Sequence, residues 1–230
     1  MTWSRSIVSP TISNLSDQTV PVAAGVVYAL GRNYAEHARE MGAKPEPVVF
    51  IKPRTALLPG GGRVPWPVGC ALVHHEVELA LLLGAGGRDL SLVDAERAIC
   101  GVAIALDLTA RDLQSDAKKA GAPWARAKGF FGSAPVSEFV DPRHRGIAWD
   151  ELDLSLTVDG AMRQSGVSSA MLLSIPEIVR VLSTWFALEA GDVILTGTPE
   201  GVGPLEPGET ALARSRALDV EVACTMGPRP

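Results

Sequence analysis

The stretch HHEVELALLL, residues 74–83, is the most informative feature of this chain. After its two histidines it alternates glutamate with apolar side chains and then becomes continuously apolar, which is typical of a buried β-strand. Successive side chains of a strand point to opposite faces, so Glu76 and Glu78 project to the same side. Two carboxylates in an apolar setting repel each other and lose hydration, and a divalent cation is their natural partner. An isolated pair of this kind is more often the solvent face of an ordinary strand.

A third acid follows one strand later. The apolar run at 101–106 predicts another buried strand, which ends at Asp107 just before a helix start at Thr109. Three carboxylates without His or Cys suit a hard cation such as Mg²⁺ or Mn²⁺ and leave coordination positions for water or substrate. The residues thus predict a metal site formed by Glu76, Glu78 and Asp107. The alternative from another class is a non-enzymatic protein whose carboxylates hold a structural Ca²⁺, or no ion.

The composition narrows the class of protein. With 230 residues, of which 47% are hydrophobic and 20% charged, the chain suits a single globular domain over residues 1–230. Its 23 glycines and 17 prolines predict many turns and favour a β-rich fold. The net charge of -5, without a cluster of Lys and Arg, argues against nucleic acid and favours a small-molecule partner. Three widely spaced cysteines fit a reducing cytoplasm, and no apolar run is long enough to cross a membrane.

Local patterns predict the remaining elements. Strands are expected at 20–30, 48–51, 152–158, 161–164, 192–195 and 217–222, and helices at 34–41, 109–121 and 174–187. The glycine- and proline-rich residues 53–67 predict turn and edge structure. Asp159-Gly160 is typical of a type I′ hairpin turn, and residues 174–177 form a capping box. The apolar stripe that ends at Trp185 predicts the core-facing side of the last helix.

Six short motifs, taken in order, resemble those of the fumarylacetoacetate hydrolase family. They are GRNYAEH at 31–37, FIKP at 50–53, HHEVEL at 74–79, LDLTARDLQ at 106–114, AKGF at 127–130 and LTGTP at 195–199. The resemblance covers about residues 25–222, and HHEVEL together with APVS at 134–137 most resembles the acylpyruvase and oxaloacetate decarboxylase branch. It implies a β-rich α+β fold, in which mixed β-sheets roll into a sandwich- or barrel-like core with a few peripheral helices. It also implies a homodimer.

The resemblance also implies roles for individual side chains. It implies that Mg²⁺ or Mn²⁺ is held by the three carboxylates already reached from the residues. It further implies the roles of His37, Glu40 and Lys128 in catalysis, and of Lys52, Arg111, Gln114 and Thr198 in substrate binding. Because His37 and Glu40 are three residues apart on a short helix, the carboxylate can orient the imidazole and hold the proton that it gains. The two lysines offset the negative charge of the metal ligands.

Each of these assignments has an ordinary alternative. A His and a Glu three residues apart are more often a solvated surface pair, and most lysines serve only solubility. Capping and packing explain Arg111 and Gln114 nearly as well as substrate binding does. Thr198 lies in a Gly/Pro loop, which is either a receptor for a carboxylate through its hydroxyl and N–H groups or an ordinary tight turn.

The implied activity is metal-dependent cleavage of C–C bonds in small 2-oxo acids. The enzyme would hydrolyse acylpyruvates to pyruvate and a carboxylate, or decarboxylate oxaloacetate, because both reactions pass through the enolate of pyruvate. The alternatives within the family are an oxaloacetate tautomerase and a fumarylpyruvate-type hydrolase or isomerase of aromatic catabolism. Nucleotide binding is rejected, because the glycines at 197, 201 and 203 have neither P-loop nor dinucleotide spacing.

Overall fold

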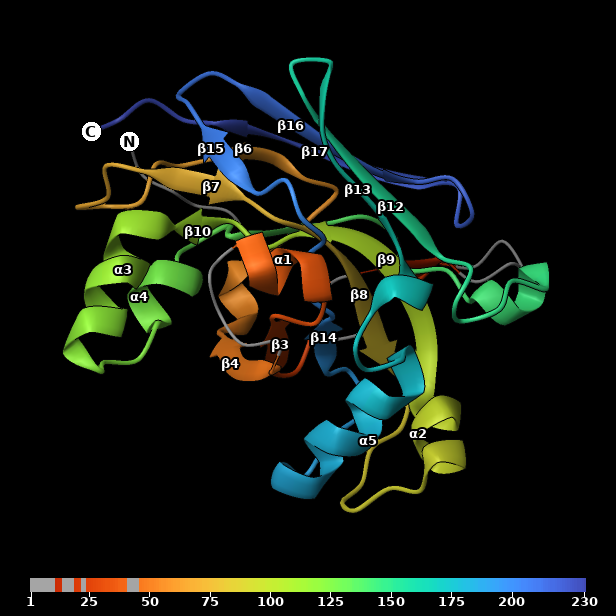
Figure 1. The fold of residues 1–230 in the computed structure, drawn as a ribbon. Coiled ribbons are helices and arrows are strands. Elements are labelled where there is room, and N and C mark those ends of the chain that lie inside the picture. The colour runs from red at the N-terminus through yellow and green to blue at the C-terminus, as the bar shows by residue number, and fades with distance from the viewer. Residues whose placement is uncertain (1–10, 14–18, 22–23, 41–45) are drawn as a thin grey trace.

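The computed structural model describes residues 11–13, 19–21, 24–40 and 46–230 (Figure 1). Within these residues the strands form sheets of two, three, seven and five strands. The seven-stranded sheet runs in the order β4 (Val48–Lys52), β3 (Val27–Gly31), β14 (Val193–Leu195), β8 (Val77–Leu83), β9 (Ile99–Leu106), β11 (Ala134–Val136) and β5 (Leu57–Pro59). It is a mixed sheet, because β14 is parallel to β3 and antiparallel to β8.

Two further sheets and a few helices complete the molecule. The five-stranded sheet contains β13 (Ala161–Val167), β12 (Asp153–Val158), β16 (Thr210–Ser215), β17 (Val220–Met226) and β6 (Gly62–Val64), and the three-stranded sheet contains β10 (Thr109–Ala110), β7 (Val73–His75) and β15 (Gly203–Leu205). A short pair joins β1 (Thr11–Ser13) to β2 (Thr19–Pro21). The helices are α1 (Ala35–Glu40), α2 (Leu92–Ala98), α3 (Arg111–Ala120), α4 (Ala125–Lys128) and α5 (Ile175–Trp185). The expected β-rich α+β fold, in which mixed sheets roll into a sandwich- or barrel-like core with a few peripheral helices, is confirmed, and the sheets curl into a half-barrel.

The core lies on both faces of the seven-stranded sheet. Every residue of β8 is buried. Leu79 and Leu81 pack in one apolar cluster with Leu156 of the five-stranded sheet, whereas Ala80 and Leu82 belong to a second cluster on the opposite face. A strand that is buried on both sides needs a continuous apolar run, which is what residues 79–83 supply.

Several local predictions are confirmed. The hairpin of β12 and β13 turns at Asp159 and Gly160, whose φ angles of 47° and 84° are those of a type I′ turn. Residues 53–67 contain β5 and β6, which are edge strands of the two large sheets. Helix α5 begins at a capping box of Ser174 and Glu177. The chain described here has no helix that is both long and apolar enough to span a bilayer.

Four local predictions are wrong in detail. The predicted strand at 20–30 is not continuous, because residues 24–26 lie outside the strands β2 and β3 that flank them. The predicted strand at 217–222 is interrupted by a turn at 216–219, because Leu218 is buried within the turn and mimics a strand position. Trp185 is 61% exposed, since the buried face of α5 is formed by Ile178, Val179 and Leu182 instead. The predicted helix at 109–121 starts at Arg111, because the two preceding residues pair with β7 as strand β10.

The stretch at 74–83 is two strands rather than one. Strand β7 pairs with β10 and β15 in the three-stranded sheet, and β8 pairs with β9 and β14 in the seven-stranded sheet. The chain changes sheets at Glu76, which belongs to neither strand. The side chain of Glu76 therefore lies where two sheets meet, and helices α3 and α4 stand beside this junction (Figure 1).

Candidate metal centre and substrate site

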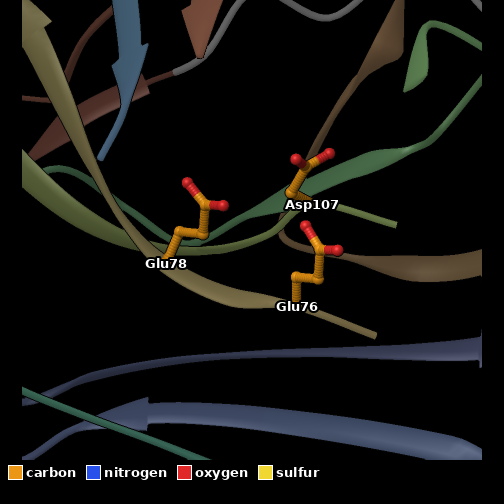
Figure 2. Close-up of side chains that lie close together, drawn as sticks. All are labelled: Glu76, Glu78 and Asp107. Atoms are coloured by element: carbon orange, nitrogen blue, oxygen red, sulfur yellow. The ribbon is translucent and has the colours of Figure 1, made fainter. Parts of the chain in front are cut away.

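Three buried carboxylates converge at the junction of the sheets. Glu78 is the second residue of β8, and Asp107 directly follows β9, the antiparallel neighbour of β8. The backbone N–H of Asp107 donates to the carbonyl of Glu76 at 2.8 Å, which fixes the third acid beside the first two. One ligand oxygen of each carboxylate lies within 4.8 Å of the others. Figure 2 shows the three side chains reaching into a common space.

The chemistry of this cluster fits a hard divalent cation. Burial, and then the carboxylates of Asp107 and Glu76, raise the pKa of Glu78 well above its usual value. Glu78 accepts a hydrogen bond of 2.7 Å from the N–H of Gly197, which holds its carboxylate in place. A set of oxygen donors without sulfur or nitrogen suits Mg²⁺ or Mn²⁺, and such a cation would offset the repulsion that raises the Glu78 pKa.

Two buried lysines contact the same carboxylates. The ammonium of Lys128, the last residue of α4, lies 2.7 Å from Glu76 Oε2 and 2.6 Å from Asp107 Oδ2. The ammonium of Lys52, at the end of β4, lies 2.7 Å from Asp107 Oδ1. Burial would lower the pKa of Lys128, but the Asp107 and Glu76 carboxylates outweigh it and raise that pKa. Lys128 therefore carries its charge at the centre of the cluster.

Lys52 is a more deeply enclosed cation. Burial lowers its pKa, and the Asp107 carboxylate opposes that effect. Its ammonium also donates to Ser133 Oγ at 2.9 Å and to the carbonyl of Lys128. Ser133 in turn donates to the same carbonyl at 2.7 Å. These contacts tie the end of β4 to the end of α4, so that the two lysines are positioned together.

Helix α3 adds an arginine and a glutamine. Arg111, its first residue, pairs with Glu76 Oε1 through Nη2 and donates to Gln114 Oε1 at 2.7 Å through Nη1. Gln114 is buried one turn further along the helix. With its oxygen used by Arg111, the amide of Gln114 presents its N–H₂ group as a donor.

Thr198 is connected to the acids through Gln164. The Gln164 amide donates to Thr198 Oγ1 at 2.8 Å and to the carbonyl of Pro199 at 2.9 Å, while its oxygen accepts from the Val77 N–H at 3.1 Å. The Val77 N–H can only donate and the Pro199 carbonyl can only accept, so these contacts fix the amide orientation. The Thr198 oxygen is used as an acceptor, which leaves its O–H to donate to a ligand.

Three residues of the site were not predicted from the sequence: Gln164, Gly197 and Ser133. Gln164 lies opposite Leu156 next to an irregularity in the pairing of β12 and β13, and this irregularity turns its side chain inward. An alternating polar strand gives no signal for such a change. Gly197 has a signal in the Gly/Pro loop after β14, but its N–H contact with Glu78 becomes visible only in three dimensions.

The predicted acid–base pair cannot be placed. His37 and Glu40 belong to α1, but their side chains lie outside the part of the chain that the structure describes. Their catalytic roles stay predictions. The neighbouring Tyr34 is described: its hydroxyl is buried without a hydrogen-bond partner among the described residues. Burial, and then the charges of Glu78 and Glu200, raise the pKa of this hydroxyl above its usual value.

Comparison with known proteins assigns the family. Residues 26–227 match the family described as fumarylacetoacetate (FAA) hydrolase, C-terminal. The chain is 46% identical over 185 residues to the mouse protein named oxaloacetate tautomerase FAHD1, mitochondrial, covering 80% of this chain and 83% of that protein. It is 39% identical over 199 residues to oxaloacetate decarboxylase, mitochondrial, of Dictyostelium discoideum, covering 85% of this chain and 91% of that protein. The chain therefore belongs to the fumarylacetoacetate hydrolase family.

A solved structure extends the comparison to the fold. The fumarylpyruvate hydrolase of Pseudomonas aeruginosa, in complex with Mn²⁺ and pyruvate, superposes with a TM-score of 0.89 at 36% sequence identity. The match covers 100% of both chains. The resemblance inferred from the six sequence motifs is thereby confirmed for the family and for the fold.

Proposed function

We propose that this protein is a metal-dependent enzyme that acts on small 2-oxo acids and interconverts the enol and keto forms of oxaloacetate. The proposal is supported by the relatives, since the mouse protein at 46% identity is named an oxaloacetate tautomerase. Glu76, Glu78 and Asp107 are proposed to hold Mg²⁺ or Mn²⁺. Tautomerisation moves one proton between carbon and oxygen and breaks no C–C bond. It therefore requires only a stabilised enolate and a positioned acid–base group.

The charge balance of the buried cluster carries this proposal. Its three carboxylates lie against three cationic side chains, those of Lys52, Lys128 and Arg111. A divalent cation would therefore leave two formal positive charges in a buried site, where an uncompensated charge is costly. Oxaloacetate carries two negative charges at neutral pH, which match that excess.

The residues around the triad have distinct tasks in this proposal. When bound, Mg²⁺ or Mn²⁺ would supply Lewis acidity at the 2-oxo oxygen. Lys128 donates to the same oxygen as negative charge develops on it. The N–H₂ group of Gln114 and the hydroxyl of Thr198 orient the substrate from two sides, and Arg111 keeps Gln114 in place. His37, assisted by Glu40, moves the proton at carbon 3, as the spacing on α1 predicts.

A second candidate is the hydrolysis of acylpyruvates. It is favoured by the likeness to the fumarylpyruvate hydrolase, which covers the full length of both chains. Hydrolysis would use the same enolate and would add a water activated by His37 against the distal carbonyl. Decarboxylation of oxaloacetate would also use that enolate, and the name of the Dictyostelium relative supports it.

Parallel assays separate these reactions. The loss of enol-oxaloacetate absorbance is followed together with pyruvate release from oxaloacetate and from acetylpyruvate, each with Mg²⁺, with Mn²⁺ and with chelator. Reactions with metal but without protein correct for the catalysis by free ions. Rapid metal-dependent loss of the enol without pyruvate release is the expected result. Pyruvate release from acetylpyruvate at the higher rate would favour the hydrolase instead, and no acceleration of any of the three reactions would overturn the proposal.

A further inference from the structure

One face of α3 begins at the three carboxylates and extends away from them. Arg111, Gln114 and Lys118 are spaced at i, i+3 and i+7, so they lie along one side of the helix. Arg111 contacts Glu76, and Gln114 contacts Arg111. Seven residues of α-helix advance about 10 Å, which places Lys118 beyond the reach of the carboxylates but in line with them.

A pair of aromatic rings holds Lys118 beside the site. Its ammonium lies 5.2 Å from the centre of the Trp124 ring. The Trp124 ring packs against Phe50 at a centroid distance of 5.8 Å, and the ammonium of Lys128 lies 5.0 Å from the Phe50 ring. Cations are attracted to the faces of aromatic rings. The Trp124 ring thus contacts the ammonium of Lys118, and the Phe50 ring contacts the ammonium of Lys128. Lys118 is thereby connected to the lysine at the centre of the metal cluster.

Lys118 has no carboxylate in direct contact among the described residues. Lys118 forms no ion pair with a carboxylate among the residues that the structure describes, whereas the adjacent Lys119 lies 3.8 Å from Asp116. Burial, and then the charges of Arg111 and Arg32, lower the pKa of Lys118, and the more distant Glu76 carboxylate offsets this only in part. A protein with a net charge of -5 thus gathers positive charge at the rim of this site. A bound anion would relieve that repulsion.

We propose that Lys118 is a second anion position that receives the distal carboxylate of a 2-oxo diacid longer than oxaloacetate. The proposal rests on the proposed function, because the 2-oxo end of the ligand binds at the triad. The carboxyl carbons of an extended four-carbon diacid are about 4 Å apart, and those of a six-carbon diacid about 6 Å apart, from ordinary C–C bond lengths. The longer acid extends about 2 Å further along α3 toward the lysine side chain than oxaloacetate does.

Two matched ligands test this position. 2-Oxoadipate and 2-oxohexanoate have six carbons and the same 2-oxo acid end, and they differ in the distal carboxylate. Neither has the 4-oxo group needed for hydrolysis or the carboxylate on carbon 3 needed for decarboxylation, so calorimetry of the Mn²⁺-loaded protein measures binding alone. The variant is Lys118→Gln. Lys119→Gln is the control, because it removes the same charge from the next residue of the same helix.

The wild-type protein is expected to bind 2-oxoadipate about fivefold more tightly than 2-oxohexanoate, as one partly exposed ion pair allows. This preference should disappear in Lys118→Gln, persist in Lys119→Gln and weaken with added salt. Equal binding of the two acids by the wild type, or an unchanged preference in Lys118→Gln, would overturn the inference and leave the proposed function intact. Failure of both acids to bind would also overturn the inference, whereas the proposed function is tested separately by the oxaloacetate assays.

Discussion

A single buried amide, that of Gln164, connects the metal strand to the loop that carries Thr198. It contacts Val77, which lies between the two glutamates, and it contacts Thr198 and Pro199 on the other side. The oxygen Oε1 of Gln164 also lies 3.0 Å from His75 Nδ1. Because this oxygen is an acceptor, as its contact with the Val77 N–H shows, Nδ1 of His75 is the donor. This residue therefore positions two parts of the site without being a proposed ligand of either the metal or the substrate.

Replacement of Gln164 should affect stability and substrate binding more than it affects kcat. Gln164→Leu would leave the Val77 N–H and the Thr198 and Pro199 oxygens without their partner, so we expect the free energy of unfolding to fall by about 2 kcal/mol. The KM for oxaloacetate should rise about tenfold, with a smaller change in kcat, because Thr198 would no longer be held. Denaturant unfolding and steady-state kinetics measure the two effects.

Gln164→Glu is the matched control. Burial favours the neutral form of a glutamate at this position, whose carbonyl oxygen keeps the acceptor for Val77 and His75 and whose O–H can donate to only one of the Thr198 and Pro199 oxygens. Gln164→Glu should therefore retain more stability than Gln164→Leu and show a smaller rise in KM. A wild-type KM in both variants would contradict the positioning role.

The residues of the site were predictable from the sequence to different degrees. The cluster of Glu76, Glu78 and Asp107 follows from strand alternation and from an acid at a strand end, and the structure brings these three side chains together. The lysines and Arg111 needed the family resemblance, because most lysines and arginines lie at the surface. Gln164 was out of reach, since its burial depends on an irregularity in a strand pair and on a partner loop 34 residues further along the chain.

At the scale of elements, the loop after β14 is held by a glycine that no other residue can replace without strain. Gly197 has a φ of 98°, and a Cβ there would lie 2.8 Å from the Cβ of Asn33 and 3.2 Å from the carbonyl of Leu30. Its N–H supports Glu78. The loop between β14 and β15 thus packs against the turn before α1, and this contact aligns it with the metal cluster.

Gly197→Ala should weaken both the fold and the metal site. Strain in the backbone and the steric contact with Asn33 are expected to lower the free energy of unfolding by about 2 kcal/mol or more. Displacement of the N–H from Glu78 should reduce Mn²⁺ affinity about tenfold. Thermal unfolding without metal and calorimetric titration with Mn²⁺ report the two effects separately.

Gly208→Ala separates backbone strain from the effect on the site. Gly208 also has a positive φ, of 89°, but a Cβ there would meet nothing within 4 Å. We expect a loss of about 1 kcal/mol of stability and wild-type affinity for Mn²⁺. Equal losses of metal affinity in Gly197→Ala and Gly208→Ala would contradict the role assigned to Gly197.

Elements with strong local signals were predicted best. The Asp159-Gly160 turn and the capping box of α5 depend on neighbours in the sequence, and both are confirmed. The change of sheet at Glu76 was not predicted, because it depends on the partners of β7 and β8 rather than on their own residues. The predicted strand at 217–222 failed for a related reason: the core buries Leu218 inside a turn.

At the scale of the whole molecule, the site is held by three sheets and two helices, and its charge makes the protein sensitive to pH. Without metal, the pKa of Glu78 is raised by burial and by the neighbouring carboxylates. A carboxyl group whose pKa is higher in the folded state stabilises the fold at low pH, and this contribution is lost as the pH rises through that pKa. The metal-free protein should therefore lose stability from this group between its unfolded and folded pKa values.

Metal binding should be coupled to proton release. Because the cation needs an ionised carboxylate, Mn²⁺ affinity is expected to rise with pH until the raised pKa of Glu78 is passed, with release of a proton below that pKa. Calorimetry in two buffers of different protonation enthalpy counts that proton. Glu78→Gln has no such proton to release. An Mn²⁺ affinity that does not change with pH in the wild type would contradict this account of Glu78.

The homodimer and the single-domain organisation stay predictions at this scale, and so do the roles of His37 and Glu40. The family was predictable because six motifs in order span most of the chain, and this is confirmed by the match over residues 26–227. The choice between tautomerisation, hydrolysis and decarboxylation was not predictable, since all three use one enolate and the same surrounding cations.

The three carboxylates of Glu76, Glu78 and Asp107 are proposed to hold the cation on which turnover depends. The most direct test is the initial rate of enol-oxaloacetate loss for the wild type and for Glu78→Gln, each with Mn²⁺ and with chelator, after circular dichroism has shown that both are folded. The glutamine keeps an acceptor for the Gly197 N–H but removes a ligand charge. We predict that chelator abolishes the wild-type rate and that Glu78→Gln is at least about a hundredfold slower with Mn²⁺. A full rate in the presence of chelator, or in Glu78→Gln, would contradict the account.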